Sequence, residues 1–297
     1  MTIYSQISAN KYKSIILVIF ALVFVIGIVA LYSYSVRGDF VLPVIAAIFA
    51  IPCSLIGYYA GDKIALATNR AQEVLPEQDP QLHRLVENLA ITAGVPKPHI
   101  YIIDSPALNA FATGRDPQHA SIAVTSGILQ ALNETELQGV LAHELSHVRN
   151  YDIRFGTLVA IFIGFIVILS DMVTRMTFFG GFRGNRDDRE NNNQLGAVLA
   201  LVSLVLLIIS PLIAQLIQLA ISRQREYLAD ASGALLTRYP EGLARALEKI
   251  SGSSKLDTAS NATAHLFIAN PFNAQKISGL FSTHPPIQDR IKRLREM

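Results

Sequence analysis

Long apolar runs interrupt an otherwise polar chain. The first covers residues 14–36 and the second residues 40–61, and neither contains a charged side chain. Both exceed the roughly 20 residues that a helix needs to cross a bilayer. Because only a short linker separates them, they predict an N-terminal transmembrane hairpin within residues 1–70.

A second pair of apolar runs predicts a second hairpin within residues 155–222. The third run, about 155–173, is short for a span, because its uncharged part ends at Ser170. The fourth, about 195–215, lies in an uncharged stretch long enough to span. A buried hairpin in a protein core is the alternative for this pair, and the length of the fourth run favours the membrane.

The polar remainder, residues 71–154 and 223–297, is large enough for one domain with its own core. Residues 80–95 have a helical pattern, whereas residues 98–105 and 121–127 alternate and are rich in Ile and Val, as in strands. A further helix is expected over residues 133–150, with Asn133 and Glu136 forming a capping box. The expected fold class is α+β: a multi-span helical membrane protein whose mostly helical domain carries a small β-sheet.

Composition agrees with membrane integration. The chain is 51% hydrophobic and only 16% charged, against about 25% charged in soluble domains. A net charge of +2 gives no indication of nucleic-acid binding. The single cysteine, Cys53, excludes an intramolecular disulfide framework.

The basic residues near the predicted spans indicate an orientation. Lys11 and Lys13 precede the first span and Lys63 follows the second, whereas the linker between them offers only Arg37. Since positive residues favour the cytoplasmic side, both ends of the first hairpin should be cytoplasmic. The arginines within residues 175–189 fall on the expected outer side and fit the rule poorly. The expectation is a multi-pass membrane protein with its polar domain in the cytoplasm.

The expected helix over residues 133–150 contains the pattern H-E-x-x-H, formed by His143, Glu144 and His147. On a helix the two histidines lie on one face and can bind the same cation. Glu144 can then reach a water molecule on that ion, as in zinc hydrolases. A solvated pair of histidines beside a glutamate is the alternative, but the apolar flanks favour a metal site.

A catalytic zinc ion needs a third protein ligand and an open fourth position. Glu226 and Asp230 lie four residues apart on a predicted helix, so Glu226 can bind the metal while Asp230 holds a ligand histidine. Two predicted spans separate His147 from Glu226, and this even number returns the chain to the same side of the membrane. The alternative is a surface pair in which these carboxylates contact Arg223 or Arg225.

Four motifs in order closely resemble the HtpX membrane metallopeptidases, relatives of the CAAX prenyl endopeptidases. They are HELSH at 143–147, EYLAD at 226–230, NAFATG at 109–114 and STHPP at 282–286. The resemblance implies one zinc ion per subunit, bound by His143, His147 and Glu226, with Glu144 as the catalytic glutamate and Asp230 in support. It further implies an inner-membrane endopeptidase that faces the cytoplasm and removes misfolded or damaged membrane proteins under stress.

The same resemblance gives roles to two further residues. Asn109 is expected to bind the substrate backbone or the oxyanion, although its motif also fits an ordinary edge strand. His284 is expected to approach the site, with a capping role before the C-terminal helix as the alternative. The expected partners are membrane-protein substrates and the lipid bilayer.

Two other functions compete with this interpretation. An intramembrane zinc protease carries the motif within a span, but charged residues such as Glu136, Arg149 and Asp152 flank it here. A catalytically silent membrane scaffold that retains a metallopeptidase fold is the second alternative. The intact set of His143, Glu144, His147 and Glu226 argues against it.

Overall fold

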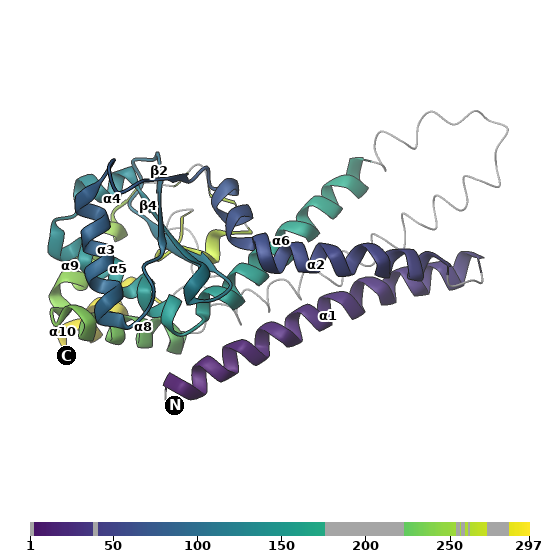
Figure 1. Cartoon of the computed structure of the whole chain (residues 1–297), viewed down its shortest axis with the longest axis horizontal. Helices are drawn as coiled ribbons and strands as arrows, with labels where there is room; N and C mark the ends of the chain where they lie inside the picture. The colour runs from purple at the N-terminus through teal and green to yellow at the C-terminus, as the bar shows by residue number, and fades with distance from the viewer. Residues whose placement is uncertain are drawn as a thin grey trace.

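The computed structural model describes residues 3–37, 41–175, 223–253, 256, 259–260, 262–271 and 285–297. Helices α1 (Ile3–Arg37) and α2 (Val41–Thr68) extend side by side from a domain of helices and strands, with α6 (Asp152–Arg175) packed against both (Figure 1). These helices coincide with the first three predicted apolar runs. The fourth, at 195–215, lies outside the described residues.

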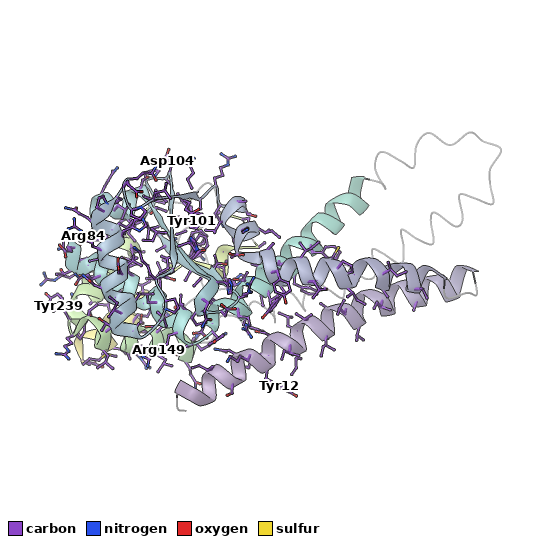
Figure 2. All side chains as sticks on the ribbon, in the orientation of Figure 1. Tyr12, Arg84, Tyr101, Asp104, Arg149 and Tyr239 are labelled. Atoms are coloured by element: carbon purple, nitrogen blue, oxygen red, sulfur yellow. The ribbon has the colours of Figure 1, made fainter. Side chains whose placement is uncertain are left out.

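An apolar cluster forms part of the contact between α1 and α6. Leu17 of α1 is buried in a cluster with Phe155, Leu158 and Val159 of α6. Other apolar side chains of α1 and α2 are exposed, as is Tyr12, 67% exposed on the outer side of α1 (Figure 2). Within the described residues, no helix is at once long enough and apolar enough for a membrane crossing. The predicted spans and domain boundaries stay predictions.

The domain contains a mixed sheet of four strands. The strands β1 (Gln72–Glu73), β2 (His99–Ile103), β3 (Ala110–Gly114) and β4 (Ala120–Thr125) lie in the order β1-β2-β4-β3. Only the central pair, β2 and β4, is parallel. The two strands expected from alternation are confirmed, and the NAFATG motif forms the edge strand β3.

Helices cover the sheet and complete the core. They are α3 (Pro80–Ala93), α4 (Ser126–Ala131), α5 (Glu134–Arg149), α8 (Arg223–Thr237), α9 (Pro240–Ser251) and α10 (Ile287–Arg295), with short 3-10 turns at Pro117–His119 and Ala264–Leu266. The expected local signals are confirmed. Gly94 ends α3 with φ 69°, and Asn133 and Glu136 form the capping box of α5. The mostly helical fold with a small sheet is therefore confirmed.

The core places α5 at the centre of the domain. Ile100, Ile122 and Val124 on one face of the sheet pack in the same cluster as Val140 and Leu141 of α5. Helices α8 and α9 pack against α5 as well. Buried on several sides, α5 holds its side chains in fixed positions, and the H-E-x-x-H residues lie on it.

Candidate metal centre

The two histidines of α5 face each other across one turn of the helix. His143 is 1% exposed, and its Nε2 atom lies 3.1 Å from Nε2 of His147. This contact follows from the i, i+4 spacing. Two imidazole nitrogens that face each other at this distance repel through their lone pairs unless a proton or a metal ion lies between them.

Glu226 reaches the same point from α8. Its carboxylate oxygens lie 3.7 Å from His143 Nε2 and 3.6 Å from His147 Nε2, and the three ligand atoms are all within 4.8 Å of one another. A tetrahedral zinc ion with bonds of about 2.0–2.2 Å separates its ligand atoms by roughly 3.3–3.6 Å. The donor set therefore fits zinc in both chemistry and spacing.

Each histidine is held through its other ring nitrogen. Nδ1 of His143 donates to Asp230 at 2.9 Å, and Nδ1 of His147 donates to Asp152 at 3.0 Å. Such carboxylate partners fix the tautomer and direct Nε2 towards a metal. Asp230 thus lies beside a candidate ligand, and its supporting role stays a prediction. Sequence reasoning missed the role of Asp152 and treated it only as a polar flank, although it lies five residues after His147.

Glu144 lies beside the three candidate ligands, and one of its carboxylate oxygens can still accept a hydrogen bond. It is 1% exposed, and its Oε1 atom has no hydrogen-bond partner in the part of the chain that the structure describes. Burial raises the pKa of Glu144 to about 7, although the charge of His147 and a hydrogen bond from the Ala112 backbone oppose the shift. A buried carboxyl group with such a pKa can accept and return a proton near neutrality.

The surrounding carboxylates favour positive charge at this position. Burial lowers the pKa of His147, but its hydrogen bond to Asp152 and the charge of Glu226 outweigh burial and raise it to about 9. Burial raises the pKa of Asp230, but the charge of Arg290 and the hydrogen bond of His143 bring it down to about 2. The same arrangement would stabilise a metal cation between the ligand atoms.

Sequence reasoning also missed Arg290, which enters the centre from α10. This arginine is fully buried, and its guanidinium donates to both oxygens of Asp230, at 2.9 and 2.7 Å. A further N–H donates to the Ile268 carbonyl at 3.0 Å. The C-terminal helix therefore contributes a side chain to the interior. A signal existed, since Arg290 falls on the same helical face as Ile287, Ile291 and Leu294.

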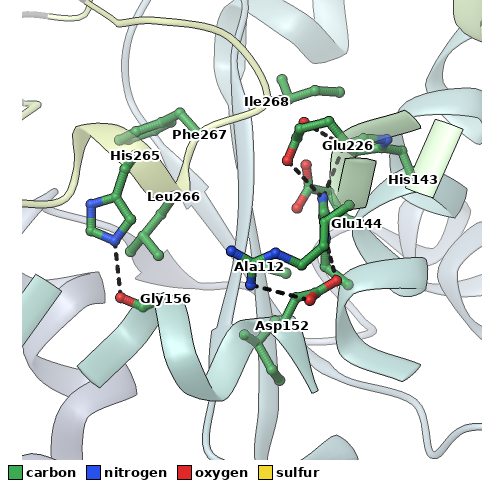
Figure 3. A pocket seen from close by; sticks show the side chains of 13 residues that line it. Ala112, His143, Glu144, Asp152, Gly156, Glu226, His265, Leu266, Phe267 and Ile268 are labelled. Atoms are coloured by element: carbon green, nitrogen blue, oxygen red, sulfur yellow. Dashed lines mark hydrogen bonds and ion pairs between the residues drawn. The ribbon is translucent and has the colours of Figure 1, made fainter. Parts of the chain in front are cut away.

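A pocket of about 50 Å³ opens beside the three ligands and Glu144. His265, Leu266 and Phe267 line its opposite side, with Ile268 at its edge (Figure 3). Asn109 supports this wall, because its amide donates to the Ala269 carbonyl at 3.0 Å and its oxygen accepts from the Ala110 N–H at 3.1 Å. Its expected role in substrate binding stays a prediction, and His284 lies outside the described residues.

Comparison with known proteins identifies the family. A protease HtpX homolog from Caldanaerobacter subterraneus is 47% identical over 302 residues, which cover 100% of this chain and 98% of that protein. A protease HtpX homolog from Streptococcus uberis is 45% identical over 99% of this chain and 100% of its own length. The crystal structure of S. mikatae Ste24p aligns with a TM-score of 0.51 at 18% identity, covering 98% of this chain and 67% of that one. At that identity the structural match shows a shared fold alone.

The model of peptidase family M48 matches residues 76–297, which hold every residue of the centre described above. The resemblance to HtpX proteins and the expected enzyme class, a metalloendopeptidase, are confirmed. The chain belongs to peptidase family M48.

Proposed function

We propose that this chain is a membrane-bound zinc endopeptidase with His143, His147 and Glu226 as the zinc ligands. The observation that carries the proposal is the convergence of the two Nε2 atoms with Glu226, while carboxylates hold both Nδ1 atoms. A group of three ligands leaves a fourth position open, as a catalytic zinc site requires.

The residues around the site support hydrolysis of a peptide bond. Zinc bound there would lower the pKa of a water molecule and polarise the substrate carbonyl. Glu144 accepts the proton of the attacking water through its available Oε1 and returns it to the leaving amine. Asp230 and Asp152 keep the ligand histidines oriented throughout. No other group is needed to balance the protons.

The proposed substrates are misfolded or damaged membrane proteins, cut on the cytoplasmic side of the inner membrane. Three observations support this location. Residues 14–36 and 40–61 carry no charge. Ile15, Ile19 and Ile48 on the helices formed by these runs are 55–61% exposed, which is unfavourable in water and favourable in lipid. Helix α6, which coincides with the third apolar run, begins at Asp152, whose carboxylate belongs to the metal centre.

The decisive experiment uses Glu144→Gln. We expect purified wild type in detergent to contain about one zinc ion per chain and to cleave casein or a destabilised membrane protein. The variant should keep the zinc and lose at least about 100-fold in rate, because a general base contributes 10²–10⁴-fold. Cleavage that survives the substitution would refute the mechanism. Wild type without zinc and without cleavage would point instead to the silent scaffold.

A second experiment tests the location. We expect the chain to remain in the membrane fraction after washing with alkaline carbonate, and we expect the end of the chain to be accessible only from the cytoplasmic face. A C-terminal tag that external protease removes from intact spheroplasts would reverse the proposed orientation.

A further inference from the structure

Helix α1 lies outside the region that matches the peptidase family, yet it reaches the metal centre. Asn10 on α1 is 2% exposed, and its amide nitrogen lies 2.7 Å from Oδ1 of Asp152. The other oxygen of Asp152 accepts the hydrogen bond from His147 Nδ1 at 3.0 Å. A continuous chain of hydrogen bonds thus joins an N-terminal residue to a candidate zinc ligand.

Contacts of neighbouring residues fix the position of α1 along its axis relative to the domain. Leu17 is buried among α6 side chains, and the Lys11 ammonium lies 4.2 Å from the centre of the Tyr151 ring. These two contacts hold the Asn10 amide in place against Asp152. The Ser14 hydroxyl, by contrast, donates within α1, to the Asn10 carbonyl at 2.8 Å.

The segment that Asn10 contacts is a sharp turn between α5 and α6. Asn150 ends α5, and Tyr151 has φ 59°, a left-handed conformation that is unfavourable for a residue with a side chain. The turn brings Asp152 back towards His147. Asn10 also donates to the Asn150 carbonyl at 2.9 Å, so one amide holds both the turn and the carboxylate.

We propose that Asn10 is a positioning residue for the metal centre, acting through Asp152 on His147. The inference rests on the proposed zinc site. Arg225 lies 3.5 Å from the same Asp152 oxygen that Asn10 contacts. When the amide is absent, Arg225 and water compete for the carboxylate, and the bond to His147 weakens. The N-terminal helix is therefore part of the metal centre, and a displacement of α1 changes the affinity for the ion.

The test measures metal binding by the full chain in detergent. Asn10→Leu removes the amide and keeps the number of non-hydrogen atoms in the side chain. The control, Asn69→Leu, removes another fully buried asparagine amide, directly after α2, which bonds to the Ala65 carbonyl and to Thr263. Ser14→Ala is a second control on α1 itself. The readouts are Co²⁺ affinity, by competition with a chelator, and the visible absorption of bound Co²⁺.

We expect Asn10→Leu to bind Co²⁺ about 10-fold more weakly and to shift the absorption bands. Loss of the direct hydrogen-bond partner of a ligand weakens binding about 10- to 100-fold, and the lower end applies because Asn10 lies one bond further out. Both controls should bind as wild type. Asn10→Asp, which places a second carboxylate against Asp152, should weaken binding further. If Asn10→Leu does not fold, Asn10→Ala decides by the same criteria.

Wild-type affinity and spectrum in a folded Asn10 variant would overturn the role of Asn10 and leave the proposed function intact. The same role fails if Asn69→Leu weakens Co²⁺ binding equally, because the effect would then be general destabilisation. Failure of the wild type itself to bind Co²⁺ or Zn²⁺ would overturn the proposed function, and this inference with it.

Discussion

At the level of single residues, each buried carboxylate of the metal centre is hydrogen-bonded both to a candidate ligand and to a further polar side chain. Asp230 is bound by Arg290, and it in turn holds His143. Asp152 contacts Asn10 and Arg225, and it holds His147. A buried charge is tolerable only when it is paired and hydrogen-bonded. Removal of an outer partner should therefore affect residues that it does not touch.

Replacement of Arg290 should be among the most damaging changes outside the ligands. Arg290→Met leaves the buried Asp230 carboxylate without its bidentate partner, so we expect a loss of about 3–5 kcal/mol in the free energy of unfolding. Arg290→Lys keeps the charge but not the bidentate geometry, and the loss should be smaller. Chemical denaturation of each variant in detergent measures the change.

The control for Arg290 lies on the same helix. Arg295 is 43% exposed and bonds to Glu241 and Glu248. Arg295→Met should cost only about 0–1 kcal/mol, as for surface ion pairs. Equal losses in the free energy of unfolding for Arg290→Met and Arg295→Met would show that the buried pair with Asp230 stabilises the fold no more than a surface ion pair does.

The contribution of Glu136 to the free energy of unfolding should depend on pH. Burial raises the pKa of its carboxyl group, but hydrogen bonds from Lys249 and the Asn133 backbone outweigh burial and place the pKa below the ordinary 4.5. A lowered pKa in the folded state contributes stability above pH 4.5, which disappears as the pH falls through the folded-state value. Glu136→Gln can keep the capping box but loses the ion pair with Lys249, so it should cost up to about 1 kcal/mol at neutral pH.

The measurement is the difference in Tm between wild type and Glu136→Gln as a function of pH. The difference should be constant at neutral pH and should shrink below about pH 4.5, the ordinary carboxyl value. A difference that persists or grows in acid would contradict the role of the ionised carboxylate.

At the scale of elements, α5 owes its position to close approaches by its neighbours. A Cβ atom at Gly139 would lie 2.7 Å from the Leu243 backbone nitrogen of α9. One at Gly233 of α8 would lie 3.0 Å from the backbone nitrogen of His143. The glycines bring two helices close to the one that carries the motif, and α8 carries Glu226. Helix packing therefore sets the distance between the ligands.

Gly139→Ala should destabilise the protein although alanine favours helix. The added methyl group must displace backbone atoms of α9, so we expect a loss of about 1–3 kcal/mol, against a gain of about 1 kcal/mol in helix propensity. At Gly164 of α6 the nearest atom would be 3.8 Å away, so Gly164→Ala should be neutral or stabilising. Thermal unfolding of both variants measures the contrast, and a stabilising Gly139→Ala would disprove the close packing.

At the scale of the whole molecule, the metal centre joins parts that are distant in sequence. The ligands come from α5 and α8, and their supports come from α8 itself and from α1, α6 and α10. A ligand that binds only the folded state stabilises that state by mass action. A metal bound at this junction should stabilise the entire domain, not only the site.

Removal of the metal should therefore lower Tm. At free zinc a hundred-fold above the Kd the expected stabilisation is about 3 kcal/mol, or roughly 5–10 °C in Tm. The experiment compares Tm before and after chelation and after zinc is restored. In Glu226→Gln, which lacks the third ligand, the chelator should have a much smaller effect. An unchanged Tm in fully chelated wild type would argue against a metal at this junction.

Features set by neighbouring residues could be read from the sequence. The capping box of Asn133 and Glu136 and the end of α3 at Gly94 depend on local hydrogen bonds and backbone conformation. The i, i+4 spacing placed His143 and His147 on one helical face for the same reason. For Glu226, spacing left two interpretations open, and the family resemblance favoured metal binding.

The distant side chains that support the ligands follow from the three-dimensional packing of the chain. Asn10 and Asp152 are separated by 142 positions, and Arg290 lies 60 positions from Asp230. No local pattern specifies such pairs, because the packing of whole helices creates them. In the sequence, Asp152 is one of several charges that flank the motif, and nothing local links Arg290 to Asp230. Local spacing set the chemistry at the centre of this site, and the packing of the helices set the residues that hold it in place.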